Sequence, residues 1–98
     1  MSRHLFVLIF EPRPGSEAAV DALLRAARVR AESAGWHCWA YRNEIAANEI
    51  TLFLEGPRRA GDEQHAVFGT EIQELRQHTA RFEPVRSLSE YPLEEVTA

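Results

Sequence analysis

The sequence predicts an α+β domain in which one four-stranded antiparallel sheet carries two helices on one of its faces. Strand-like and helix-like segments follow each other in the order β-α-β-β-α-β, the split pattern of the ferredoxin-like fold. The chain has 98 residues, 45% of them hydrophobic, and a formal net charge of −4. This length is enough for one domain, residues 1–98, and too short for two.

The first strand and the first helix carry clear local signals. Residues 5–10 read Leu-Phe-Val-Leu-Ile-Phe and are followed by a segment with two prolines and a glycine, which predicts a strand and then a turn. Ser16 is expected as the N-cap of a helix, because apolar residues recur after it at helical spacing as far as Ala34. Gly35 is expected to end that helix.

A hairpin is expected in the middle of the chain. Residues 36–42 and 50–55 are rich in aromatic and β-branched side chains and predict two antiparallel strands joined by residues 43–49. Gly56 and Pro57 are expected to end the second of these strands.

The last third of the chain predicts a helix and a final strand. Helical spacing extends from about residue 62 to residue 82, with a break expected at Gly69 and Thr70 because glycine disfavours a helix interior. Residues 85–91 predict the fourth strand, which Pro92 would stop.

The first strand is apolar on both of its faces. Near-continuous apolar strands are typical of sheets buried on both sides, whereas two helices can cover only one side. The second face must therefore be covered by another copy of the sheet, by a ligand, or by both. We expect a homodimer formed sheet to sheet.

The hairpin register sorts side chains between the two faces. A pivot between Ala46 and Ala47 would place Tyr41 opposite Leu52 and Trp39 opposite Leu54, and opposed residues share a face. The set expected to pack under the helices is Trp39, Tyr41, Ile50, Leu52 and Leu54. The mixed set, expected to line a cavity on the other face, is Trp36, Cys38, Ala40, Arg42, Thr51, Phe53 and Glu55.

Composition excludes several classes of function. The sequence has no lysine, which excludes Schiff-base chemistry and the lysine of a P-loop. Its arginines are scattered, so we expect no nucleic-acid partner. Cys38 is the single cysteine, and no histidine or carboxylate spacing suits a metal, so no disulfide, metal or bound cofactor is expected. The apolar run 5–10 is too short to cross a membrane, and we expect a cytoplasmic protein with no membrane partner.

Over nearly its whole length the chain resembles the antibiotic-biosynthesis-monooxygenase-like group of the dimeric α/β-barrel superfamily. The resemblance rests on Pro14-Gly15 before the first helix, Gly35-Trp36 and Tyr41 in the second strand, Leu54-Glu55 in the third, and residues 65–75. It implies a homodimer whose sheets face each other to form a barrel, with a pocket in each protomer between the sheet and the second helical segment. Counting back from Gly15, it also implies that Leu8, and with it His4, Phe6 and Phe10, points into the barrel.

Departures from the group narrow the expected chemistry. Its members often carry a tryptophan just past the glutamate of the third strand, where this chain has Gly56-Pro57. The asparagine, tryptophan and histidine of the haem-degrading branch fall on or near Leu8, His65 and Arg76, which disfavours haem degradation. The resemblance then implies cofactor-free oxygenation of a polyphenolic or quinol-type substrate.

A candidate ligand pocket and two candidate functions follow. The pocket is expected to comprise Phe6, Leu8, Phe10, Trp36, Cys38, Phe53 and His65. His65 is the candidate catalytic residue, because an imidazole exchanges a proton near neutral pH, although a helix histidine bonded to a backbone carbonyl is the simpler interpretation. The protein is then either a cofactor-independent monooxygenase-like enzyme acting on an aromatic or polyketide-like molecule, or a non-catalytic dimeric module that binds a hydrophobic ligand or serves in assembly.

Overall fold

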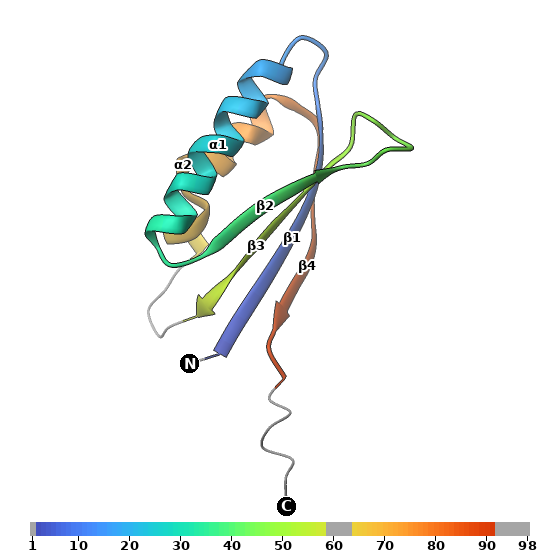
Figure 1. Cartoon of the computed structure of the whole chain (residues 1–98). Coiled ribbons are helices and arrows are strands. Elements are labelled where there is room, and N and C mark those ends of the chain that lie inside the picture. Colours follow the sequence, from blue (N-terminus) through green and yellow to red (C-terminus); the bar gives the residue numbers. More distant parts are fainter. Residues whose placement is uncertain (1, 59–63, 92–98) are drawn as a thin grey trace, which may run out of the picture.

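The structure is a computed structural model that describes residues 2–58 and 64–91 (Figure 1). Its elements are β1 (Ser2–Pro12), α1 (Glu17–Ser33), β2 (His37–Arg42), β3 (Ile50–Arg58), α2 (Gln64–Gln77) and β4 (Thr79–Ser89). The four strands form one antiparallel sheet in the order β2-β3-β1-β4. The predicted ferredoxin-like fold is confirmed. No helix within the described ranges is long and apolar enough to cross a membrane.

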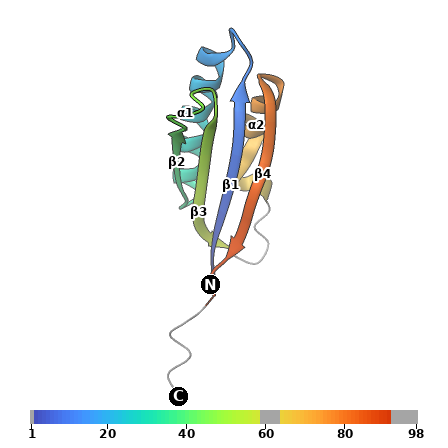
Figure 2. The same cartoon turned by 90° about the vertical axis from the view of Figure 1, so that its right-hand side faces the viewer.

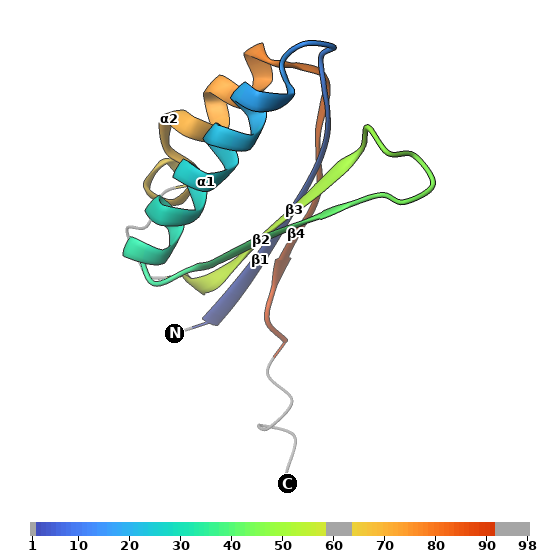
Figure 3. The same ribbon diagram turned by 45° about the horizontal axis from the view of Figure 1, so that its top comes forward.

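Both helices lie on one side of the sheet. Figure 2 views the opposite side, with the four strands in front and the helices behind, and Figure 3 shows α1 and α2 side by side. We call the covered side the helix face; it carries His4, Phe6, Leu8 and Phe10 of β1, all buried. The uncovered side, the open face, carries Leu5, Val7 and Ile9, which are half-buried. The expectation that His4, Phe6, Leu8 and Phe10 point away from the helices is therefore wrong.

The core is the layer between the helix face and the two helices. Its largest fully buried side chains are Phe10, Val20, Leu52, Leu54 and Leu75. Arg30 of α1 and Glu71 of α2 pair across the two helices, with Nε donating to Oε2 at 2.6 Å and Nη2 to Oε1 at 3.1 Å. This paired hydrogen bond lowers the pKa of the Glu71 carboxyl.

Two glycines define the ends of α1. Gly15 and Gly35 both have positive φ, 87° and 82°, a backbone region that glycine adopts without a steric penalty. After Gly35 the backbone N–H of Trp36 donates to the carbonyl of Ala31 at 2.8 Å, so the predicted helix end is confirmed. Ser16 occupies the predicted N-cap position, but its side chain makes no capping hydrogen bond.

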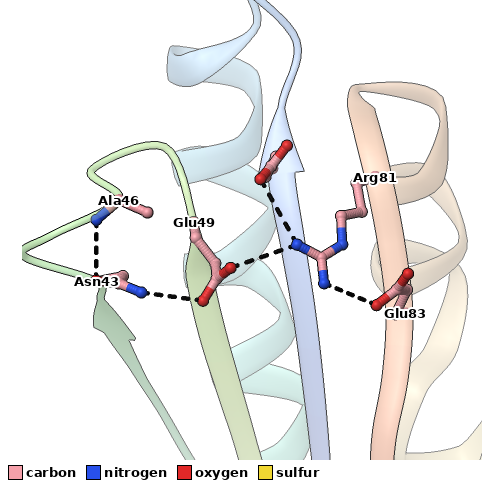
Figure 4. Close-up of polar contacts among 6 residues, drawn as sticks. Asn43, Ala46, Glu49, Arg81 and Glu83 are labelled. Carbon is pink, nitrogen blue, oxygen red and sulfur yellow. Dashed lines mark hydrogen bonds and ion pairs between the residues drawn. The ribbon is translucent and has the colours of Figure 1, made fainter.

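The hairpin register differs by one residue from the prediction. Trp39 pairs with Phe53 and Ala40 with Leu52, so the pivot is Ala46 itself. Asn43 explains the shift: its Oδ1 accepts from the N–H of Ala46 at 3.0 Å (Figure 4). Its own backbone N–H donates to the Glu49 carbonyl at 2.9 Å. This Asx-type turn closes the loop symmetrically about Ala46.

The shift moves the side chains of β2 to the face opposite the predicted one, as a slip of one residue must, while those of β3 lie where predicted. Cys38, Leu52 and Leu54 lie on the helix face and are buried. Trp39 and Tyr41 lie on the open face and are 38% and 64% exposed. The predicted placement is therefore wrong for β2: Trp36, Cys38, Ala40 and Arg42 lie on the helix face, and Trp39 and Tyr41 do not. The β3 members lie where predicted, with Ile50, Leu52 and Leu54 under the helices and Thr51, Phe53 and Glu55 on the open face.

Strand β3 continues beyond the predicted end at Gly56 and Pro57. Gly56 pairs with His4 and Pro57 with Arg3 of β1. On its other side β3 pairs with β2 only as far as Glu55 in the described chain. One edge of β3 is thus unpaired at Pro57, where a residue without a backbone N–H is tolerated.

The boundary between α2 and β4 also differs from the prediction. The helix runs without a break through Gly69 and Thr70 and ends at Gln77, and β4 begins at Thr79 rather than at residue 85. Thr79 and Phe82 fit helical spacing, but Phe82 instead pairs with Phe10 of β1. Pairing with a long apolar strand therefore outweighs the local helical pattern.

Gly56 leaves space for a tryptophan ring. The indole of Trp36 lies over the Gly56 backbone, and a Cβ at position 56 would overlap its Cγ and Cδ2 atoms. Trp36 in turn stacks on Phe6, with ring centroids 5.9 Å apart. Glycine at position 56 is thus required by the ring above it and not by backbone conformation, since its φ is not positive.

We expect Gly56→Ala to destabilise the fold by about 1–3 kcal/mol, the usual cost of overpacking a filled site. Denaturant unfolding would measure the loss. In a Trp36→Leu background the same alanine should cost much less, because the smaller side chain leaves room for the methyl group. An equal loss of stability in both backgrounds would contradict the conclusion that the Trp36 indole excludes a side chain at position 56.

Candidate functional site

A groove of about 880 Å³ lies between β1, β4 and α2; we call it the α2 groove. Its apolar lining is Phe6, Leu8, Ile72, Phe82 and Pro84. Polar lining comes from Gln73, Arg76 and Gln77 of α2 and from Arg86 and Ser87 of β4. A largely apolar cleft of this size with a few polar groups is typical of small-molecule sites.

An irregularity in β4 shapes one wall of this groove. Val7 pairs with Arg86 and the next residue, Leu8, pairs with Pro84, so Val85 is an extra residue in β4. Such a bulge bends its strand and redirects the side chains next to it. Val85 consequently lines the groove.

The α2 groove is electropositive in an acidic protein. Its described lining includes no aspartate or glutamate, although the whole chain has a formal charge of −4. The guanidinium carbon of Arg76 lies 5.0 Å from the centroid of the Phe82 ring, which holds this cation against the groove wall. Arg76 forms no ion pair with any carboxylate of the described residues. Its charge is available to an acidic group on a ligand.

A buried histidine lies at one end of the groove. His4 is 3% exposed, and its Nε2 lies 2.9 Å from Oγ of Ser87, a groove-lining residue. Its Nδ1 lies 3.5 Å from Oγ of Ser89, and its ring stacks on Phe6 with centroids 4.1 Å apart. Sequence reasoning placed His4 on the opposite face and missed Ser87, because no local count fixes the register between β1 and β4.

The structure brings together only some of the predicted pocket residues. Phe6 and Leu8 line the α2 groove. Phe10, Trp36 and Cys38 lie on the same face but are buried in the core beneath the helices. From the core, Trp36 stacks on Phe6 and Phe10 stacks on Phe82, and both Phe6 and Phe82 line the groove.

Two predicted residues are not placed in the groove. Phe53 lies on the open face, stacked on Trp39 with centroids 5.3 Å apart, so its assignment to the same pocket as Phe6 is wrong. His65 falls within the first turns of α2, but its side chain lies outside the described residues.

Cys38 has the properties of a core residue. Burial raises the pKa of its thiol to about 11, despite the opposing effect of Arg28. Near neutral pH the thiol therefore stays protonated and is a poor nucleophile.

A second, smaller groove of about 380 Å³ lies between the start of α1 and the ends of β2 and β3. It is lined by the carboxylates Glu17 and Asp21 together with Tyr41 and Arg42. Its mixed charge and smaller volume suit an extended aromatic ligand less well than the α2 groove. Among the described residues no cluster of three or more histidine, cysteine or acidic side chains can hold a metal ion.

The open face has an apolar centre and charged ends. Tyr41 contacts Phe53 edge to face, with centroids 5.7 Å apart, beside the Trp39–Phe53 stack. At one end Arg81 lies 2.9 Å from Glu83, 3.4 Å from Glu49 and 3.7 Å from Glu11 (Figure 4). Near the other end Arg3 pairs with Glu55 at 2.6 Å. This is the arrangement of many interfaces, an apolar core within a polar rim.

No protein-family model matches the sequence, and no curated protein matches it significantly. Solved structures do match. Rv0793 from Mycobacterium tuberculosis is 25% identical, with a TM-score of 0.70 over 98% of this chain and 100% of that one. A protein from Bordetella bronchiseptica named as a candidate antibiotic biosynthesis monooxygenase is 20% identical, with a TM-score of 0.61 over 95% and 99% of the two chains.

A protein from Nitrosomonas europaea with the same description is 10% identical and has a TM-score of 0.65, covering 93% of this chain and 90% of that one. At these identities the Bordetella and Nitrosomonas proteins establish the fold alone. Both matches extend over at least 90% of each chain. This chain has the ferredoxin-like fold of these solved structures, two of which are named as candidate antibiotic biosynthesis monooxygenases.

Proposed function

We propose that this chain forms a homodimer through the open face and binds a small aromatic or polyketide-like molecule in the α2 groove, acting on it as a cofactor-independent monooxygenase-like enzyme. The observation that carries the proposal is the α2 groove itself, about 880 Å³, apolar, with Arg76 and no described carboxylate in its lining. The names of two structural relatives support the reaction class.

A second copy of the chain suits the open face better than any other occupant. The open face has a central apolar band between two ion-paired ends. A two-fold interface would place the apolar band of one copy against that of the other. Stable dimers of this kind bury about 2,000 Å² or more in total. A sheet face carrying Val7, Trp39 and Phe53 would otherwise leave an apolar surface in water.

We expect Val7→Asp to convert the dimer to monomer, because an unpaired carboxylate at an apolar interface costs several kcal/mol. Light scattering coupled to size exclusion at micromolar concentration would measure the mass. The matched control is Val29→Asp on α1, where the native valine is 65% exposed and remote from the sheet, and this variant should stay dimeric. A monomeric wild-type protein, or a dimeric Val7→Asp variant, would refute the interface.

The lining of the groove supports a planar ligand that carries an acidic group. Phe6 and Phe82 offer aromatic surface. The Arg76 guanidinium, held on Phe82 at 5.0 Å, supplies a positive charge at the same wall. A carboxylate or an ionised hydroxyl on the ligand would form a charge-assisted hydrogen bond there.

We expect 1-naphthoate to bind in the α2 groove and Leu8→Trp to abolish its binding by filling the groove, at a cost of about 1–3 kcal/mol in stability. Arg76→Gln should weaken 1-naphthoate about tenfold or more, the effect of losing a hydrogen bond to a charged group. Calorimetric titration would measure both changes.

Two controls make this result specific. The neutral analogue 1-naphthalenemethanol should bind Arg76→Gln as well as wild type. Arg25→Gln on α1 removes an arginine that pairs with Asp21 away from the groove, and should change neither ligand. Binding of 1-naphthoate that survives Leu8→Trp would place the ligand elsewhere.

His65, in the first turn of α2, remains our proposed catalytic residue. The second candidate function is a non-catalytic ligand-binding module. Gly56 favours the binding module, because the position after Glu55 of β3 carries no side chain that could contact a ligand.

Turnover separates the two candidates. If the protein is an enzyme, oxygen uptake with a polyphenol series should fall by about 10²–10⁴-fold in His65→Ala, while 1-naphthoate binding stays near the wild-type value. An oxygen electrode would measure the rate. If the wild-type protein takes up no oxygen with any member of the series, the binding module is favoured. If uptake is equal in both proteins, His65 has no part in the mechanism.

A further inference from the structure

We propose that Ser87 and His4 form a proton-accepting pair at the end of the α2 groove, in which Ser87 contacts an ionisable hydroxyl of the ligand and His4 holds the proton. This inference deepens the proposed function, because it concerns the ligand of the same groove. Ser87 is the catalytic residue of the pair, and His4 is a positioning residue that acts through it.

The Nδ1–H tautomer of His4 lets the Ser87 hydroxyl donate to the imidazole ring. With the imidazole proton on Nδ1, Nε2 accepts a hydrogen bond from the Ser87 hydroxyl at 2.9 Å, and Nδ1–H faces Oγ of Ser89 at 3.5 Å. Ser87 is exposed and lines the groove, whereas His4 is buried behind it. A ligand can therefore reach the Ser87 oxygen and reaches His4 through that oxygen.

Packing holds the imidazole in this orientation. The His4 ring stacks on Phe6, with centroids 4.1 Å apart and planes inclined at 28°. Phe6 stacks on Trp36, and Trp36 lies over Gly56, which pairs with His4 across β1 and β3. A proton acceptor whose rotamer is fixed by a packed aromatic stack loses little entropy when a ligand binds.

The transfer moves protons only. The hydroxyl O–H bond of the ligand breaks and its proton binds Oγ of Ser87, while the original Ser87 proton forms an N–H bond with Nε2 of His4. The electron pair of the broken bond stays on the ligand oxygen, giving an oxyanion, and His4 becomes an imidazolium. Arg76, in the same groove, favours the negative charge.

The proton affinities select the class of ligand. An ordinary phenol ionises near pH 10 and an imidazole near 6.5, so transfer from an ordinary phenol is unfavourable by several pKa units. The pair therefore suits an acidic hydroxyl, such as the enol of a 1,3-dicarbonyl compound or a phenol with an electron-withdrawing substituent. Efficient transfer needs matched pKa values.

Charged groups around the pair come from three strands and one helix. The described ones nearest in register are Arg3, Glu55 and Arg86 on the strands, Glu90 just past the end of β4, and Arg76 on α2. Arg3 and Glu55 pair with each other at 2.6 Å, so their charges largely cancel. The test therefore compares variants of the same protein, so that the effect of these surrounding charges is common to all of them.

The probe is 4-nitrophenol, whose ionised form absorbs visible light and whose neutral form does not. At the midpoint pH of the unbound probe, wild-type protein should raise the ratio of ionised to neutral bound probe about tenfold or more, as a nearby opposite charge does. Ser87→Ala and His4→Gln should each abolish most of this increase while the probe still binds. His4→Gln keeps a polar partner for Ser87 but cannot hold the proton.

Ser33→Ala is the matched serine control, since Ser33 is exposed on α1 and its hydroxyl donates to the Val29 carbonyl. It should leave the ratio unchanged. If His4→Gln does not fold, Ser87→Ala decides the question, because Ser87 is exposed and its removal leaves the core intact.

The outcomes separate this inference from the proposed function. An unchanged ratio in Ser87→Ala, with 1-naphthoate still lost in Leu8→Trp, would overturn the proton-accepting pair and leave the groove standing. So would a wild-type protein that binds 1-naphthoate but not 4-nitrophenol. If neither compound binds, the groove is no ligand site and both proposals fail.

Discussion

The rest of the structure depends on the pairing of β1 with both β3 and β4. This strand is apolar on both of its faces and lies inside the sheet, so its alternation assigns every neighbouring residue to the helix face or to the open face. Through its partners β1 joins residues that are far apart in sequence, most importantly His4 with Ser87 and Phe10 with Phe82. The α2 groove and the open face thus lie on opposite sides of β1.

Sequence patterns predicted the order of the elements, the first helix and its glycine end, because those signals are local. The hairpin register could not be predicted from spacing alone, since its pivot depends on side-chain hydrogen bonds of Asn43 to the loop backbone. Residues 79–82 fit helical spacing, and only pairing with β1 makes them part of a strand. Of the predicted pocket, Phe6 and Leu8 line the groove, whereas Ser87 required a long-range register that no count provides.

Ligand binding and self-association use opposite faces of the sheet in our proposals. The α2 groove opens between the helix face and α2, and the proposed dimer contact lies on the open face. Substitutions at odd-numbered positions of β1 can therefore alter association without touching the groove. Even-numbered positions combine ligand contact with core packing, so changes there affect stability as well.

Because Trp36 contacts Gly56, the side-chain size allowed at one of these positions depends on the size at the other. Only one of them can carry a large side chain, because the indole occupies the space that a Cβ on the other would need. In other sequences with this fold, these two positions should therefore vary together, with a bulky residue at one matched by a glycine at the other. The aromatic wall next to the groove can then be built from either of two segments, and exchanging the two side-chain sizes would move it from position 36, just before β2, to position 56 of β3.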